Sequence, residues 1–412
     1  MKVLRLATYC YPEQVASSHL INDLAEACQK EDIVLVIYTP APSRGLDAET
    51  IKKYKKIKYE ERYDGHVEIH RFPMFKEPKN SFFRAFRYTL CIIKQFFNAI
   101  FAKDIDVYFA SSTPPINGLM FPFIKAFKKY RILYSLQDIF PDSLVNTGMT
   151  KKGSVIWKIG RVVENITYKY CDKILVISED FKKNIMEKGV PEDKIEVLYN
   201  WVDENQVVKI ERSDNVLFDK YNLDRNKFYI CYSGNIGYTQ NMEMLSNVAK
   251  ELEVNSDIQF VIIGEGAYKE KLQQIIEQKE IKNITLIPFQ DYEIISHVFS
   301  LGDVGLIISK KDVGTNSVPS KTWSIMSAET PVLASFDKGS ELDDIITQNY
   351  CGVCVEADDE NALKNAILKM YENRDEIYKL GSNGRKFILN NLTKEIGTKK
   401  RIDMLKQIIA ED

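Results

Sequence analysis

Short apolar runs recur along the chain and alternate with longer amphipathic stretches. The runs are rich in β-branched residues and largely continuous, which is typical of parallel strands covered on both faces. The first series is VLRLAT, IVLVIYT, DVYFASS, RILYSLQD and KILVISE, and the second is FYICYSG, QFVIIGEG, ITLIPF, VGLIIS and PVLASF. Because the alternation restarts near residue 227, it predicts two doubly wound α/β domains.

The ends of the two series suggest where the domains divide. Residues 203–227 are polar and poor in strand pattern, so we expect them to connect the domains. Near the C-terminus, Ile402, Leu405, Ile408 and Ile409 recur at helical spacing and predict a closing helix. The expected division is residues 1–205, residues 206–385, and residues 386–412 as a helix closing back toward the N-terminal domain.

The charge balance excludes some partners and suggests another. The 412 residues carry 56 basic and 58 acidic side chains, which gives no reason to expect nucleic acid. Residues 1–200 hold 31 Lys+Arg and 24 Asp+Glu, or +7, whereas residues 201–412 hold 25 and 34, or −9. The first apolar run is too short for a signal peptide, and no run of ~18 uncharged apolar residues exists, so we expect a cytoplasmic protein. The seven cysteines form no disulfide or metal framework.

Two glycine-containing junctions between strand and helix are candidate ligand loops. Ligands of open α/β sheets bind beyond the carboxyl ends of the strands. One junction contains Gly234, Asn235, Gly237 and Gln240, and the other contains Gly264, Glu265 and Gly266. Glycines let backbone N–H groups approach a phosphate, but a tight turn alone also needs glycine, so both interpretations stay open.

A third candidate is TNSVPSKTWSIMSAETPVLAS, residues 315–335. Asn316 or Ser317 can cap a helix that has Pro319 in its first turn. Lys321 then lies in that first turn, where a cation opposes the helix dipole. The unfavourable position of Lys321 makes a nearby anion more plausible.

Several motifs together resemble a known family. They are VISEDFKKNIMEKGVPEDKIEVLYNWVD, YSGNIGYTQNMEML, VIIGEGAYKEKL, NITLIPFQDYEIISHVFSLGDVGLI and SKTWSIMSAETPVLAS followed by DKGSE. In order and spacing the chain resembles the retaining GT-B glycosyltransferases that build bacterial capsule and O-antigen. YPEQVASSHLINDLA, ASSTPPINGLM and LQDIFPDS are similar to the branch with N-acetyl-fucosamine-type transferases. The resemblance implies two Rossmann-like domains facing across a cleft, the first binding acceptor and the second binding nucleotide-sugar.

The resemblance also assigns roles to residues, and this chain departs from the family pattern. Where much of the family has two acids near the donor, this chain has Asn316 and Ser324, and Asn235 and Gln240 replace the usual Arg and Lys. Lys321 is the expected compensating cation. The implied donor residues are Gly234, Asn235, Gly237, Gln240, Gly264, Glu265, Asn316, Ser320, Ser324 and Glu341; the implied catalytic residues are Asp138 and Lys321; the implied acceptor-side residues are Ser17, Ser18 and His19.

The implied reaction moves a sugar of the hexose type from a UDP-sugar to a polyprenyl-diphosphate-linked glycan with retention of configuration. The sugar is expected to be an N-acetylated or a deoxy amino sugar. Backbone N–H groups of residues 234–237, the helix start near Ser320 and Lys321 are expected to stabilise the leaving diphosphate, with no metal and no cofactor. Two alternatives remain: a non-catalytic nucleotide-sugar-binding or scaffold protein, and a UDP-sugar 2-epimerase. The epimerase site is rich in His, and this chain has four His in all.

Two basic and aromatic stretches, residues 80–103 and 121–131, suggest a membrane surface as a partner. The first has many Phe and Ile residues together with Arg84, Arg87 and Lys94, and no acid. An apolar stripe of one helix can simply pack on a sheet, but the aromatic surface exceeds what one stripe needs. We therefore expect peripheral docking on the anionic inner face of the plasma membrane.

Overall fold

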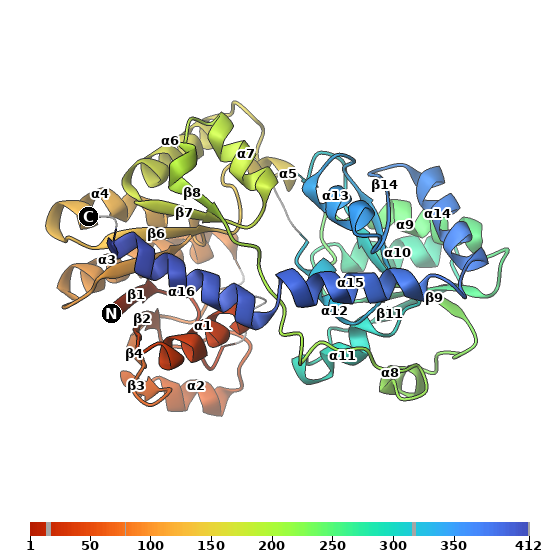
Figure 1. Cartoon of the computed structure of the whole chain (residues 1–412), viewed down its shortest axis with the longest axis horizontal. Coiled ribbons are helices and arrows are strands. Elements are labelled where there is room, and N and C mark those ends of the chain that lie inside the picture. The colour runs from red at the N-terminus through yellow and green to blue at the C-terminus, as the bar shows by residue number, and fades with distance from the viewer. Residues whose placement is uncertain (14–17, 79, 315–318, 411–412) are drawn as a thin grey trace. The chain divides into compact units, whose positions relative to one another are not determined.

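The chain forms two compact units in the computed structural model, which describes residues 1–13, 18–78, 80–314 and 319–410 (Figure 1). Unit 1 comprises Met1–Val145, Thr150–Tyr199 and Gly397–Asp412, and unit 2 comprises Asn146–Met149 and Asn200–Ile396. Each unit has its own sheet and its own core.

The sheet of unit 1 has the strand order β3-β4-β2-β1-β5-β6-β7-β8, with all pairs parallel except β3 with β4. Its strands are β1 (Lys2–Leu6), β2 (Val34–Pro40), β3 (Tyr59–Arg62), β4 (Val67–Phe72), β5 (Val107–Ser111), β6 (Arg131–Leu136), β7 (Lys173–Val176) and β8 (Ile195–Val197). The helices are α1 (Ser18–Lys30), α2 (Ala48–Tyr54), α3 (Ser81–Phe101), η1 (Pro115–Met120), α4 (Phe121–Phe127), α5 (Asp142–Asn146), α6 (Val155–Tyr170), α7 (Glu179–Glu187), η2 (Glu192–Lys194) and α16 (Lys394–Ala410).

Right-handed crossovers place the helices of unit 1 on both faces of its sheet. The chain passes from β4 to β5 through α3 and then adds β6, β7 and β8 in one direction, so α3, α4, α6 and α7 share a face. The predicted closing helix, α16, is present and packs on unit 1. Its Arg401 guanidinium lies 5.5 Å from the centroid of the Phe109 ring in β5, and Lys406 pairs at 2.7 Å with Glu31, which follows α1. The strand order changes direction between β1 and β5, which is where a doubly wound sheet offers its ligand crevice.

The sheet of unit 2 is parallel, with the order β11-β10-β9-β12-β13-β14. Its strands are β9 (Phe228–Ser233), β10 (Ile258–Ile263), β11 (Ile284–Ile287), β12 (Val304–Ile308), β13 (Val332–Phe336) and β14 (Gly352–Glu356). The helices are α8 (Val216–Lys220), α9 (Met242–Leu252), α10 (Lys269–Gln278), η3 (Tyr292–Ile294), α11 (Ile295–Phe299), α12 (Lys321–Ser327), α13 (Glu341–Gln348), α14 (Glu360–Glu372) and α15 (Tyr378–Asn391). The direction of strand addition changes between β9 and β12, so the loops after these two strands border the ligand crevice.

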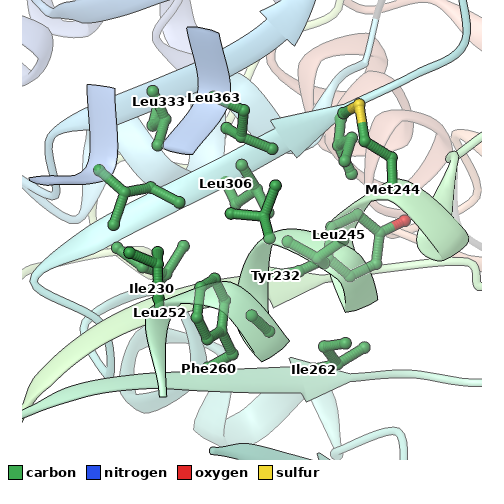
Figure 2. Close-up of a cluster of buried hydrophobic side chains, with 14 of the residues drawn as sticks. Ile230, Tyr232, Met244, Leu245, Leu252, Phe260, Ile262, Leu306, Leu333 and Leu363 are labelled. Atoms are coloured by element: carbon green, nitrogen blue, oxygen red, sulfur yellow. The ribbon is translucent and has the colours of Figure 1, made fainter. Parts of the chain in front are cut away.

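The core of unit 2 forms where strand residues meet helices α9 and α14 (Figure 2). Strands β12 and β13 are buried along their whole length, as their continuous apolar runs predict. The buried side chains in this cluster include Ile230, Tyr232, Leu245, Leu252, Phe260, Leu306, Leu333 and Leu363. Each fully buried Leu or Phe stabilises the fold by roughly 1.5–3 kcal/mol. This core fixes the strand ends that carry the candidate donor loops.

The polar stretch 203–227 is built into unit 2 and does not form an open connection between the units, so that part of the sequence prediction is wrong. Val207, Leu217 and Phe218 are buried, and Ser327 donates its hydroxyl hydrogen bond to the Val207 carbonyl at 2.7 Å. Few apolar residues among many charged ones are enough to anchor this segment, which is why its pattern looked like a linker.

Candidate functional site

The loops after β9 and β10 lie against each other through backbone atoms. Ile236 N–H donates to the Glu265 carbonyl at 2.9 Å, and Tyr268 N–H donates to the Ile236 carbonyl at 2.9 Å. A Cβ at Gly264 would lie 1.9 Å from the Gly234 carbonyl oxygen, so no larger residue fits there. A Cβ at Gly266 would lie 2.2 Å from the Ile236 carbonyl oxygen. The close approach of the two loops is thus sufficient to require Gly264 and Gly266.

Most backbone N–H groups of residues 234–237 are already used inside the protein. Gly234 N–H donates to the Ile263 carbonyl, Ile236 N–H to Glu265, and Gly237 N–H to Gln240 Oε1 at 3.0 Å. Within the described residues, only the Asn235 N–H of this loop has no hydrogen bond. The expectation that the whole loop cradles a phosphate is therefore wrong, because backbone pairing with the neighbouring strand and the Gln240 side chain satisfies the other donors.

Lys321 lies at the start of α12 and reaches the end of β9. Its Nζ is 3.5 Å from the centroid of the buried Tyr232 ring, and a Cβ built on Gly234 would be 3.5 Å from the same Nζ. Lys321 has no hydrogen bond and no ion-pair partner among the described residues. Burial lowers the pKa of the Lys321 ammonium to about 7, whereas the electron-rich face of Tyr232 favours its charged form. A partly exposed cation without a carboxylate partner is a candidate anion site.

The helix that carries Lys321 is shorter than its sequence pattern suggested. It begins at Lys321, so Pro319 precedes the first turn, and the N-cap residue is Ser320, whose side chain makes no capping hydrogen bond. Asn316, predicted as a cap and as a donor residue, lies outside the described residues, as does Ser317. Ser324 is half-buried within α12.

A carboxylate that the sequence reasoning missed holds the chain just before residue 315. Asp337, which directly follows β13, accepts hydrogen bonds from Asp312 N–H at 2.9 Å and Gly314 N–H at 2.7 Å. Its position immediately after a strand was the available signal. Glu341 opens α13 next to it, behind the N-cap residue Ser340. Glu265, in the loop after β10, pairs at 2.6 Å with Lys269, the first residue of α10.

The acceptor-side residues lie in unit 1, and the structure places some of them. Asp138 follows β6. Desolvation by the surrounding protein raises the pKa of the Asp138 carboxyl to about 6. Its side chain also contacts solvent, which weakens such a shift. The neighbouring Gln137 donates its backbone N–H to Ser112 Oγ at 3.0 Å and its Nε2 to Ser135 Oγ at 3.2 Å. His19 is half-buried in the first turn of α1, and α1 begins at Ser18. Ser17 lies outside the described residues.

A buried carboxylate in the loop after β1 was not predicted. Glu13 Oε1 accepts hydrogen bonds from Ser43 N–H and Arg44 N–H, each at 2.8 Å, and burial raises the pKa of Glu13. These bonds join the loops after β1 and β2 next to the point where the strand order changes direction. Glu13 therefore shapes the carboxyl edge of the unit 1 sheet.

The described residues contain no group of three or more His, Cys, Asp and Glu side chains arranged to hold a metal ion. In the same part of the chain, no helix is both long and apolar enough to cross a membrane.

Comparisons with known proteins identify the class to which this fold and these loops belong. The model for glycosyl transferases group 1 matches residues 213–387, and the model for glycosyltransferase family 4 matches residues 18–206. The first model covers most of unit 2 and the second most of unit 1, and the fold is that of the GT-B glycosyltransferases, so the prediction of two Rossmann-like α/β domains is confirmed.

The individual relatives are distant. The chain is 25% identical over 312 residues to the probable glycosyltransferase WbjE of Pseudomonas aeruginosa, covering 75% of this chain and 76% of WbjE. It is 26% identical to the putative colanic acid biosynthesis glycosyl transferase WcaI of Escherichia coli K12, covering 58% of this chain and 59% of WcaI. Anabaena HepE, solved with UDP and glucose, has a TM-score of 0.73 at 15% identity and covers 99% of this chain and 100% of its own.

Proposed function

We propose that the protein transfers a sugar of the hexose type from a UDP-sugar to a polyprenyl-diphosphate-linked glycan, with retention of configuration and without a metal ion. In this proposal the sugar is an N-acetylated or a deoxy amino sugar. The observation that carries this proposal is the Lys321 ammonium, which lies over Tyr232 beside Gly234 without a carboxylate partner in the described residues. A role in polysaccharide assembly is supported by the name of the relative WcaI, and UDP by the ligand of the neighbour HepE. We also propose that the protein belongs to the branch of the family that contains N-acetyl-fucosamine-type transferases.

Lys321 acts on the leaving group in this proposal. When the bond between the anomeric carbon and the phosphate oxygen breaks, its electron pair goes to UDP, and negative charge grows on the diphosphate. A cation held in a partly desolvated place stabilises that charge more strongly than one in water. The acceptor hydroxyl forms the new glycosidic bond on the same face of the sugar, and its proton passes to the departing phosphate oxygen. The Asn235 N–H is the backbone donor left for the diphosphate.

Phe289 is the proposed platform for the nucleobase. It follows β11 by two residues and is 70% exposed, while its neighbour Gln290 is held by Tyr221 and by the Pro288 carbonyl. The Ile287 carbonyl accepts the Gly264 N–H at 3.0 Å, which places this loop beside the glycine loop after β10. An exposed ring at a strand end provides an apolar face on which a base can stack.

A membrane is the proposed place where the lipid-linked acceptor is met, with α3 and α4 as the docking elements. Phe86, Phe97 and Phe101 of α3 and Phe123 and Phe127 of α4 are all more than half exposed, so they do not serve the core. One expected basic residue is not available for lipid, because Arg87 is 1% exposed and its Nε donates to the Phe75 carbonyl at 3.0 Å.

The membrane part of the proposal has its own experiment. Reversing the charge of the exposed Arg84 and Lys94 should reduce sedimentation with vesicles rich in anionic lipid at low salt. An Arg87→Glu variant would instead be expected to unfold unit 1, so it is unsuitable as a probe. Equal sedimentation of wild type and the double variant would exclude electrostatic docking through α3.

The experiment for the transfer reaction is an assay with a panel of UDP- and GDP-sugars on polyprenyl-diphosphate-linked acceptors. Wild type is compared with Lys321→Ala and with a matched control, Lys311→Ala, whose side chain is exposed and paired with Glu356 at 3.2 Å. Loss of transfer only in Lys321→Ala supports the proposal. Interconversion of UDP-sugars without acceptor would indicate an epimerase, and binding of UDP without any turnover would indicate a scaffold.

A further inference from the structure

Helix α6 presents an apolar face to solvent that the sequence pattern did not reveal. Val155, Ile156, Ile159 and Val162 are 73%, 58%, 60% and 57% exposed. They recur at spacings of three and four residues and therefore share one side of the helix. A soluble α/β domain normally turns such a stripe toward its sheet.

The opposite side of α6 is fully engaged, so the exposed stripe is not a core face that has failed to pack. Gly160 lies so close to Pro141 that a Cβ there would be 2.6 Å from the Pro141 side chain. Glu164 is buried, accepts the Tyr168 hydroxyl at 2.8 Å and pairs with Lys188 at 3.0 Å. The helix is thus held rigidly on unit 1 by one side while its apolar side remains outside.

The exposed charged groups on α6 and in the four residues before it are basic. Lys151 and Lys152 precede α6, and Lys158 and Lys169 lie on it, all four exposed. The acid of this helix, Glu164, points into the unit and is paired. Apolar side chains ringed by lysines complement an anionic lipid surface, and a second copy of this same basic face would meet them with like charge.

Helix α6 lies next to the helices of the docking surface proposed for α3 and α4. Helix α4 packs against both α3 and α6 in unit 1. These helices share one face of the sheet because each connects strands added in the same direction. Figure 1 shows α6 and α4 on unit 1, in the yellow and orange part of the chain.

The N-terminal end of α6 is also tied to the loop that carries Asp138. Trp157 Nε1 donates to Asp142 Oδ1 at 3.3 Å, and Asp142 lies four residues after Asp138. Val155 and Ile156 therefore lie at the helix end that is tied to this loop.

We propose that α6 inserts its exposed stripe into an anionic bilayer beside Asp138, so that a lipid-linked acceptor passes from the membrane to the acceptor-side residues along this helix. This inference rests on the proposed function for its acceptor, but its lipid contact can be measured independently. It adds to α3 and α4 a contact close to the carboxyl edge of the sheet.

The test uses the full-length double variant Ile156→Glu/Ile159→Glu. Its matched control is Val254→Glu, which places an acid on a 94% exposed valine of unit 2. Sedimentation is measured with vesicles of equal phosphatidylcholine and phosphatidylglycerol and with phosphatidylcholine alone. Transfer is measured with a long polyprenyl-diphosphate acceptor in vesicles and with a short water-soluble analogue, and the oligomeric state is measured by light scattering.

We expect the double variant to bind anionic vesicles about tenfold or more weakly than wild type and Val254→Glu. Its KM for the vesicle-bound acceptor should rise by a similar factor, while kcat with the short analogue stays unchanged. Unaltered vesicle binding would overturn the inference. So would a wild-type dimer that the double variant dissociates, because the occupant would then be a second copy. If no variant transfers sugar but vesicle binding still depends on Ile156 and Ile159, the proposed function fails and the lipid contact stands.

Discussion

Replacing Lys321 by methionine should stabilise the protein and at the same time weaken its binding of UDP. Methionine keeps the length and apolar character of the side chain but removes the charge. In wild type, folding buries the ammonium and lowers its pKa from 10.5 to about 7. At pH 7 the unfolded state holds this proton almost fully and the folded state about half, which costs roughly 4 kcal/mol of stability.

The contact with Tyr232 offsets part of this cost. A cation 3.5 Å from a ring centroid gains about 1–2 kcal/mol. The net gain expected for Lys321→Met is therefore about 2–3 kcal/mol at pH 7, or several degrees in Tm for a unit of this size. The control Lys311→Met removes an exposed lysine and should change Tm little.

The stability difference between wild type and Lys321→Met should depend on pH with a defined sign. Between pH 7 and 10.5 the unfolded state binds more protons at Lys321 than the folded state, so wild-type stability rises with pH relative to the variant. The advantage of Lys321→Met should shrink across this interval, as thermal unfolding at pH 7 and pH 9.5 would show. A less stable variant, or a difference that does not depend on pH, would refute the reasoning and make Lys321 a structural cation.

Three further predictions follow from the same contacts. UDP affinity measured by calorimetry should weaken up to tenfold per pH unit above about pH 7, with net proton uptake, because the ligand needs charged Lys321; affinity that is constant from pH 7 to 9 would contradict this. Gly264→Ala should lose UDP binding and lower Tm, because its Cβ would meet the Gly234 carbonyl oxygen, whereas Gly339→Ala, with open space around it, should show only a small loss from its φ of 74°. Phe289→Ala should weaken UDP binding about tenfold and leave Tm unchanged, and Phe289→Tyr should restore binding; unchanged affinity in Phe289→Ala would remove the proposed platform.

The sequence pattern was sufficient for most of the architecture because parallel strands buried on both faces need continuous apolar runs. The ten apolar runs do not include β3, β4, β14 or the three-residue β8. Strand β4 alternates buried and half-buried residues, and β3 and β14 are edge strands with weak apolar character. It also misjudged residues 203–227, where a few buried side chains anchor a segment that is mostly charged. Local composition does not show which isolated apolar residues find a core.

The candidate site was only partly accessible from the sequence. The unusual position of Lys321 at a helix start was visible, but its place over Tyr232, 89 residues earlier in the chain, depends on the pairing of β9 with β12. Glycines at 264 and 266 suggested a phosphate loop, yet the structure explains them by the approach of two backbones. Hydrogen bonds that occupy a loop internally are a tertiary property, so the sequence could not show that most donors of residues 234–237 are taken.

The measurement that tests the central claim most directly is sugar transfer by wild type, Lys321→Ala and Lys311→Ala from UDP-sugars to a polyprenyl-diphosphate-linked acceptor. Removing one preorganised charge contact to a leaving group is expected to lower kcat by about a hundredfold or more. The account predicts this loss in Lys321→Ala and wild-type rates in Lys311→Ala. Full activity in Lys321→Ala would contradict it.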